Sequence, residues 1–185
     1  LEAGARQVML FCYEDAPARA LLRALQAQCI PTVILRPSGV CPRLEAGEHG
    51  NVYVHDIPFL DQAGFDHLLW SSDLNVVRGE DSLVRGLWAA KPFIWHIYPQ
   101  EAGVHMDKLH ALLDRSPLST AVRQLMNAWN AGLADAFAAG LADILEAPAW
   151  TQWQRDAERW SIELSGQPSL VDSLMAFCTH HGRTG

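Results

Sequence analysis

Short apolar runs recur along the first hundred residues and are separated by polar or turn-forming segments. Each run is too short for a helix that packs by itself, and bulky apolar residues in such runs are typical of strands buried on both faces. We predict strands at five of these runs: Gln7–Tyr13, Thr32–Leu35, Asn51–Ile57, Leu74–Val77 and Phe93–Ile97.

Helical signals lie between these strands. Leu21, Leu22 and Leu25 follow a 3.6-residue period after Pro17, which favours an amphipathic helix. Asp61 is placed as the N-cap of a second helix that runs to about residue 70, and a third is expected at 83–90. The segment 36–50 is rich in Pro, Gly and Glu and predicts a loop. Strands that alternate with helices indicate an α/β fold with a Rossmann-like parallel sheet and helices on both faces.

The pattern changes after Gln100. No further strand is indicated, and four helical segments are expected at 105–114, 119–145, 150–165 and 169–180. We therefore expect a Rossmann-like domain over residues 1–116 and a helical C-terminal extension over residues 117–185.

Composition narrows the classes of function. A net charge of −7 and a pI near 5.5 disfavour broad binding to nucleic acid or to anionic membranes. No apolar stretch approaches the roughly 20 residues that span a bilayer, and the N-terminus lacks the features of a signal peptide. The four cysteines form no C-x-x-C pair, and Cys12 and Cys29 are expected as buried free thiols. These features favour a cytoplasmic protein without a metal site.

The segment from Asp73 to Gln100 carries the candidate chemistry. A strand leads into a turn at Gly79 and then into a helix start, where free backbone N–H groups and the helix dipole suit a diphosphate. Arg78 and Ser82 add donors for phosphate oxygens. No Walker loop or G-x-G-x-x-G fingerprint is present, which disfavours a nicotinamide-dependent oxidoreductase.

Two acids in this segment have two interpretations. Glu80 and Asp81 could accept hydrogen bonds from ribose hydroxyls beside the phosphate. Alternatively, they are the first turn of a capped helix, where the dipole favours acids. Spacing alone favours the second interpretation.

The stretch DLNVVRGEDSLVRGLWAAKPFIWHIYPQ, with PFLDQAGFDHLLW before it, resembles the C-terminal domain of the EF-P-specific protein-arginine rhamnosyltransferases, the EarP family. The resemblance covers roughly residues 8–100. It implies one half of a GT-B glycosyltransferase that transfers rhamnose from dTDP-β-L-rhamnose to an arginine of elongation factor P, inverting the anomeric centre without a metal. The C-terminal domain of the family holds the donor nucleotide.

The resemblance also assigns roles to individual positions. Phe59 matches the aromatic that stacks on thymine and Gln62 a polar contact to the nucleotide, although residue type alone favours a helix-entry staple and a solvated helix residue. Glu80 matches a glutamate required for activity, and we expect it to be catalytic. The other positions expected to bind the donor are Phe11, Tyr13, Arg78, Gly79, Asp81 and Ser82.

The resemblance does not extend to a whole enzyme. The family's general base is an aspartate of an N-terminal domain that we do not find in this sequence, and an arginine nucleophile needs a carboxylate to deprotonate or steer it. We therefore expect this chain to bind the donor without turning it over alone. The alternative is a nucleotide-binding regulatory module that uses the same pocket and needs no second domain.

Overall fold

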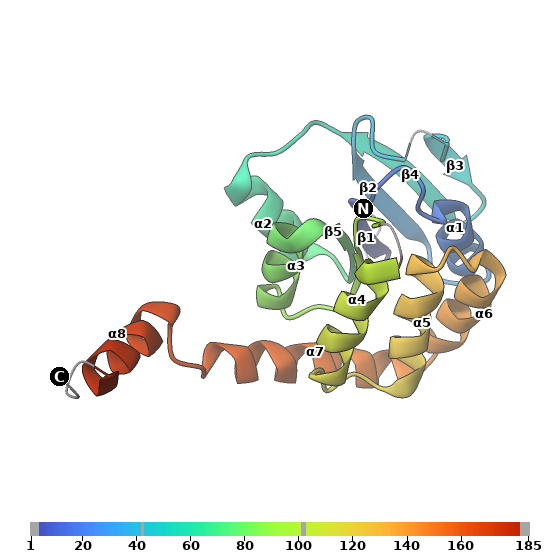
Figure 1. Ribbon diagram of the computed structural model, residues 1–185. Coiled ribbons are helices and arrows are strands. Elements are labelled where there is room, and N and C mark those ends of the chain that lie inside the picture. Colours follow the sequence, from blue (N-terminus) through green and yellow to red (C-terminus); the bar gives the residue numbers. More distant parts are fainter. Residues whose placement is uncertain (1–3, 42, 101–102, 182–185) are drawn as a thin grey trace.

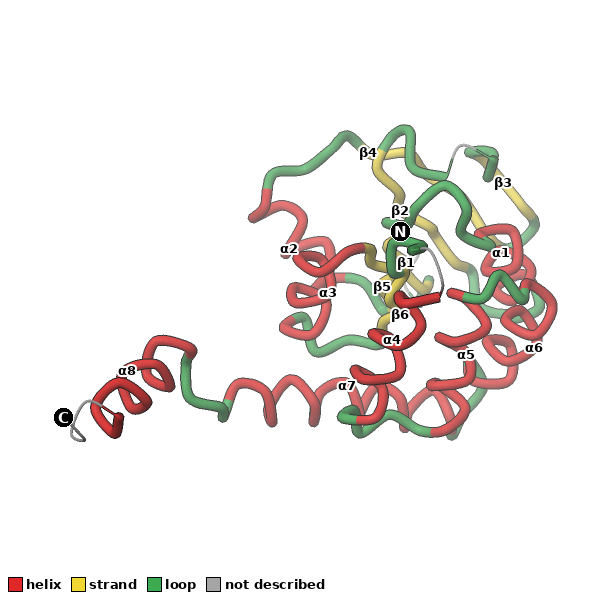
Figure 2. Tube along the Cα trace, viewed as in Figure 1, coloured by secondary structure: helices red, strands yellow, loops and turns green. Residues whose placement is uncertain are grey.

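The computed structural model describes residues 4–41, 43–100 and 103–181, and within them six strands form one sheet in the order β3-β4-β2-β1-β5-β6 (Figures 1 and 2). All neighbouring strands run parallel except β3 and β4. The strands are β1 (Arg6–Leu10), β2 (Thr32–Pro37), β3 (Gly47–His49), β4 (Val52–Ile57), β5 (Leu74–Arg78) and β6 (Phe93–His96). The five strands that the sequence predicts are confirmed.

The strand order has a topological switch point. On one side of β1 the sheet continues with β2 and then β4. On the other side it continues with β5 and then β6. The order therefore reverses between β1 and β5. Open parallel sheets bind ligands at this switch point, outside the carboxyl ends of the strands. In this chain, those ends are followed by Phe11 on one side and by Gly79 on the other.

The edge strand β3 is a departure from the sequence-based expectation of a continuous loop at 36–50. It pairs antiparallel with β4, with Gly47 opposite Val54 and His49 opposite Val52. Gly50 turns the chain between the two strands with a φ of 68°. A three-residue strand made of Gly, Glu and His has no apolar alternation, so the hydrophobic pattern could not reveal it.

Helices cover both faces of the sheet, as expected, and the fold class is confirmed. In Figure 1, α2 (Gln62–Ser71) and α3 (Gly79–Trp88) lie on one side, and α1 (Ala18–Gln26), α5 (Thr120–Asn130) and α6 (Ala134–Ile144) lie on the other. On α1, Leu21 and Leu25 are fully buried, which confirms the face that its spacing predicts. α1 ends before Cys29, and Cys29 is therefore exposed and not buried as expected, whereas Cys12 is buried.

The single helix expected at 119–145 is wrong, because the chain forms two helices, α5 and α6. Gly132, with a φ of 68°, occupies the left-handed position after α5. Its N–H donates to Trp129 O at 3.3 Å, and the Leu133 N–H donates to Ala128 O at 2.9 Å. These two bonds form the Schellman motif that ends a helix at a glycine.

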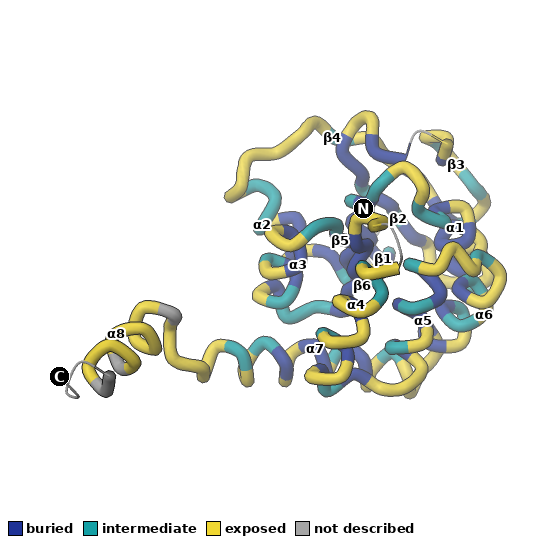
Figure 3. The backbone as a smooth tube through the Cα atoms, viewed as in Figure 1, coloured by how far each residue is buried: buried dark blue, intermediate teal, exposed yellow. Residues whose placement is uncertain are grey.

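Three further helices complete the described chain: α4 (Val104–Asp114), α7 (Ala149–Ser165) and α8 (Leu170–His181). α7 buries Trp153 and Trp160, whereas α8 projects from the body and is largely exposed (Figure 3). α5 packs on β6, and α6 packs on α1. The helices after residue 117 thus cover part of the sheet domain, and a domain boundary near residue 116 stays a prediction. No helix of the described residues has the length and apolar character that crossing a membrane requires.

Candidate functional site

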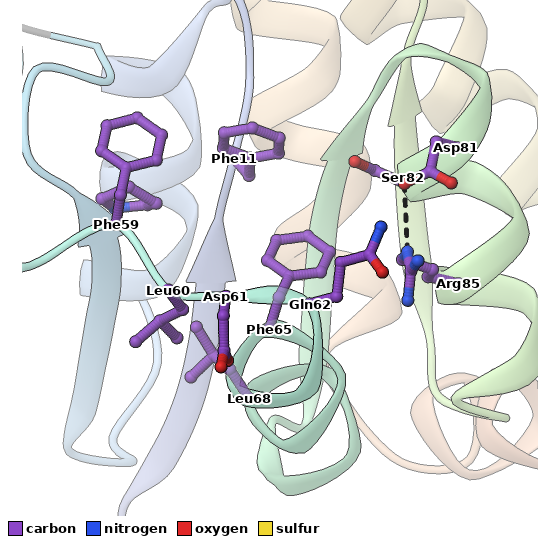
Figure 4. Close-up of a pocket in the computed structure, with 11 residues that line it drawn as sticks. Phe11, Phe59, Leu60, Asp61, Gln62, Phe65, Leu68, Asp81, Ser82 and Arg85 are labelled. Carbon is purple, nitrogen blue, oxygen red and sulfur yellow. Dashed lines mark hydrogen bonds and ion pairs between the residues drawn. The ribbon is translucent and has the colours of Figure 1, made fainter.

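An apolar pocket lies where the loop after β4, the loop after β1 and the start of α3 meet (Figure 4). Its volume is about 180 Å³. This is less than the roughly 300–1,000 Å³ of sites that enclose a whole drug-sized ligand, so it suits one ring system of a larger ligand. The lining residues are Phe11, Pro37, Phe59, Leu60, Asp61, Gln62, Phe65, Leu68, Asp81, Ser82 and Arg85.

Phe59 is the most exposed aromatic of the pocket, with 66% of its surface accessible. Asp61 is the N-cap of α2, as the sequence predicts, and its carboxylate accepts from the Gly64 N–H at 2.8 Å. A hydrophobic staple forms from the residue directly before the N-cap, and that position is Leu60 and not Phe59. The start of α2 is therefore fixed without Phe59, and the expectation of a staple at Phe59 is wrong.

The back wall of the pocket is better packed. Phe11 meets Phe65 edge to face, with the ring centroids 5.6 Å apart. Figure 4 shows Gln62 between Phe65 and the start of α3, with its amide toward Ser82. The pocket thus has one rigid aromatic wall, one exposed aromatic at the opposite side and an amide within it.

Arg78 lies beside the pocket at the end of β5. Its guanidinium carbon is 4.2 Å from the ring centroid of Phe11 and 5.1 Å from that of Tyr13, within the range of cation–π contacts. One guanidinium N–H donates to Cys12 O at 3.2 Å. Among the described residues no carboxylate lies within 4.0 Å of this guanidinium. A fixed positive charge without a counter-ion is suited to an anionic ligand.

The start of α3 lies next to Arg78. Gly79 has a φ of 65°, and a Cβ atom on it would lie 3.3 Å from the Tyr13 hydroxyl. The glycine therefore lets Tyr13 approach the helix start. No side chain caps the first N–H groups of α3, and the hydroxyl of Ser82, which lines the pocket, has no hydrogen-bond partner within the described residues. These donors are available to a ligand.

The two acids of this turn differ. Asp81 accepts from Arg85 Nε at 3.0 Å, and Arg85 also donates from one nitrogen to both oxygens of Asp66, each at 2.9 Å. This network supports a structural role for Asp81 as part of the first helical turn. Glu80 is exposed and has no hydrogen-bond or ion-pair partner among the residues described.

Sequence reasoning missed Arg85, which lines the pocket, and its ion-pair partner Asp66. The Asp81–Arg85 spacing of four residues on one helix was a readable signal. The contact with Asp66 was not, because it requires that α2 and α3 lie side by side.

Two aromatic residues pack on Tyr13, and Arg78 lies over its ring. His96, at the end of β6, is almost fully buried and packs edge to face on Tyr13 with centroids 5.3 Å apart, while the exposed Tyr98 packs on it at 5.4 Å. Burial raises the pKa of the Tyr13 phenol, and the charge of Arg78 opposes this shift. The phenol is therefore a protonated hydrogen-bond donor at neutral pH. Within the described part of the chain, no group of three or more His, Cys, Asp or Glu side chains could hold a metal ion.

Fold and site together define a Rossmann-like α/β domain with an aromatic pocket and an uncapped helix start at its switch point. The family model described as "Elongation-Factor P (EF-P) rhamnosyltransferase EarP" matches residues 1–179. This chain belongs to that family.

Named relatives agree with this assignment. The chain is 36% identical over 197 residues to the protein-arginine rhamnosyltransferase of Pseudomonas aeruginosa, covering 95% of this chain and 51% of the relative. It is 39% identical over 166 residues to that of Neisseria meningitidis serogroup B, covering 80% of this chain and 42% of the relative. The chain thus spans about half the length of the curated relatives it matches.

A solved structure is also similar. It is described as the structural basis for EarP-mediated arginine glycosylation of translation elongation factor EF-P. It is 33% identical, aligns with a TM-score of 0.77, and covers 97% of this chain and 62% of its own. At this identity and coverage, the likeness extends over the sheet and the helices that follow it.

Proposed function

We propose that this chain is the donor-binding part of an inverting glycosyltransferase that transfers rhamnose from dTDP-β-L-rhamnose to an arginine of elongation factor P. One observation carries the proposal. Side chains from three separate segments, the loop after β1, the loop before α2 and the start of α3, converge at the switch point of the sheet. Because the chain belongs to the rhamnosyltransferase family, we infer that the ligand of this site is a nucleotide-linked rhamnose.

The thymine base fits the apolar pocket. Phe59 offers an exposed ring face on one side, and Phe11 lies in the wall behind it. Stacking on an aromatic side chain is worth about 1–3 kcal/mol per base in single-strand binders. Gln62 would donate to or accept from the polar edge of the base. The pocket is too small for a whole nucleotide sugar, so the diphosphate would lie outside it, toward Arg78.

The diphosphate fits the start of α3. The guanidinium of Arg78, the hydroxyls of Tyr13 and Ser82 and the uncapped N–H groups would donate to its oxygens. As the bond between the anomeric carbon and the diphosphate breaks, negative charge grows on the departing oxygen. Donors that are already in place stabilise this charge without reorganisation. The cationic side chain and helix start would thus serve the leaving group without a metal ion.

The exposure of Glu80 and its lack of a described partner support contact with the ligand and not a role in the fold. Its exposed carboxylate follows Gly79 in the first turn of α3 and is not bound to another described residue. We propose that it contacts the ribose, the sugar or the acceptor arginine. Asp81 has one oxygen bound to Arg85, which leaves the other free for a ribose hydroxyl.

Turnover would require residues outside this chain. An arginine nucleophile has to be deprotonated or steered by a carboxylate, and the resemblance places that aspartate in an N-terminal domain. The relatives are about twice as long as the span they share with this chain. Exposed apolar side chains on α8, at Val171, Leu174 and Met175, support packing of the helical extension on that further domain.

Calorimetry on the 185-residue chain tests donor binding. We expect binding of dTDP and dTDP-rhamnose and none of NAD, and binding of NAD alone would refute the proposal. Mass spectrometry of EF-P, incubated with dTDP-rhamnose and a protein of the relatives' full length that contains this chain, then separates an enzyme from a regulatory module. We expect one added rhamnose with that protein and none with the 185-residue chain. Failure of the longer protein to modify EF-P would favour the module.

A further inference from the structure

One peptide unit in the site is held from both sides by side chains of neighbouring strands. Arg78, at the end of β5, donates to the carbonyl oxygen of Cys12 at 3.2 Å. His96, at the end of β6, accepts at Nδ1 from the N–H of Tyr13, also at 3.2 Å. This carbonyl and this N–H belong to the same peptide bond, Cys12–Tyr13, which follows β1.

The surroundings of His96 fix its protonation. Its ring is 3% exposed and packs edge to face on Tyr13 and on Trp129, with centroids 5.3 and 5.9 Å away. Because Nδ1 accepts a hydrogen bond, the single proton of the neutral ring lies on Nε2, which is 3.8 Å from Asp15 Oδ1.

The charges around the ring support the neutral form. Burial lowers the pKa of His96 to about 4. Arg78 and His105 add to the lowering, and Asp15 opposes it. Tyr13, the other titratable group in contact, is a neutral phenol at neutral pH. The imidazole is therefore an acceptor over the whole neutral range.

We propose that His96 is a positioning residue for donor binding, because its neutral Nδ1 sets the plane of the Cys12–Tyr13 peptide. That plane determines where the Tyr13 ring lies, and it presents the Cys12 carbonyl that holds the guanidinium of Arg78. The guanidinium also makes a cation–π contact with Tyr13. Arg78 and Tyr13, the two side chains that we propose to bind the diphosphate, therefore both depend on this one peptide. The inference rests on the proposed function, since Tyr13 and Arg78 matter only if an anion binds before α3.

The proposal requires an acceptor at this position and not merely a ring. A protonated imidazole carries N–H on both nitrogens and cannot accept from Tyr13. The half-buried Tyr13 N–H would then lose its partner, and a second positive charge would lie near Arg78. The peptide would rotate or shift to relieve both effects.

Two substitutions separate the hydrogen bond from the packing. In His96→Asn, the amide oxygen reaches close to the place of Nδ1 and can accept from Tyr13. In His96→Leu, the site stays apolar and filled but has no acceptor. With dTDP in calorimetry, we expect about tenfold weaker binding for the leucine variant, the effect of one lost buried hydrogen bond, and binding within about threefold of wild type for the asparagine variant. In the protein of the relatives' full length, the leucine variant should raise the donor KM more than it lowers kcat.

A pH series adds a test that needs no leucine variant. Between pH 6 and pH 4 the dTDP affinity of the wild type should fall about twofold more than that of His96→Asn, because only the wild type can protonate at this position and about half of its rings are protonated at pH 4. Parallel profiles of the two proteins would overturn the positioning role. Equal losses in the leucine and asparagine variants would also overturn it, since packing would then be the cause.

The outcomes distinguish this inference from the proposed function. A wild-type chain that does not bind dTDP overturns the proposed function and this inference with it. A wild-type chain that binds dTDP, together with a folded leucine variant that binds equally well, overturns the role of His96 alone.

Discussion

Replacing Phe59 with alanine tests the aromatic pocket most directly. Two-thirds of the Phe59 surface is exposed, and the start of α2 is fixed by Asp61 and not by this ring. The substitution should therefore leave the fold intact. Surface changes of this kind alter the free energy of unfolding by about 0.5 kcal/mol or less.

Its effect on binding should be larger. If thymine stacks on Phe59, the loss of the ring removes about 1–3 kcal/mol. At about 1.4 kcal/mol for each factor of ten, the Kd for dTDP should rise roughly 5- to 150-fold. Because the diphosphate donors at Arg78 and α3 are untouched, binding should weaken and not disappear. Calorimetry on wild type and variant measures this change.

A matched control is available in the same helix-and-loop segment. Trp70 is 52% exposed, lies at the other end of α2 and does not line the pocket. Trp70→Ala should leave the Kd for dTDP unchanged. An unchanged Kd in Phe59→Ala, or an equal loss in both variants, would refute the placement of the base against Phe59.

Four further results are expected. Glu80→Ala should abolish EF-P rhamnosylation by the protein of the relatives' full length without changing its melting temperature, and near-normal turnover would return Glu80 to a helix-start role. Gly79→Ala should destabilise the fold by about 1–2 kcal/mol, measured by denaturant unfolding, because alanine is strained at positive φ and would crowd the Tyr13 hydroxyl. Asp61→Ala should cost about 1 kcal/mol in the same assay, whereas Asp61→Asn should cost little, since asparagine also caps. The pKa of His96 is about 4 in the folded protein against 6.5 for a free histidine, so the unfolded chain takes up the proton first as the pH falls. Wild type should therefore lose stability between pH 6.5 and 4 by up to about 3 kcal/mol more than His96→Asn, and equal losses would contradict the shifted pKa.

The sequence predicts the sheet well because its parallel strands are buried and therefore apolar. Runs such as 74–77 have few other stable arrangements in a domain of this size. Features with polar or backbone causes were not predictable in the same way. The edge strand β3 has no hydrophobic pattern, and the break at Gly132 depends on one residue within a helical period that continues on both sides.

In the candidate site, too, some residues could be predicted from the sequence and others could not. Residues next to a strand end or a helix start, such as Arg78 and Ser82, follow from the order of elements along the chain. Contacts between elements do not, because they depend on the distance and tilt of two helices or two strands. The pairing of Arg85 with Asp66 and the bond from Tyr13 to His96 belong to this second kind.

An ion pair between α2 and α3 connects the aromatic pocket with the start of α3. The aromatic pocket proposed for the base is built mainly on the loop before α2 and on α2 itself, whereas the donors proposed for the diphosphate belong to the ends of β1 and β5 and to the start of α3. Arg85 connects the two parts. It lies on α3 and lines the pocket, and it donates to both carboxylate oxygens of Asp66 on α2. A nucleotide has a limited span between its base and its diphosphate, so a protein that binds both has to hold the two sub-sites within that separation. We propose that the ion pair between α2 and α3 provides this restraint, which would account for an arginine at the edge of a mainly apolar pocket.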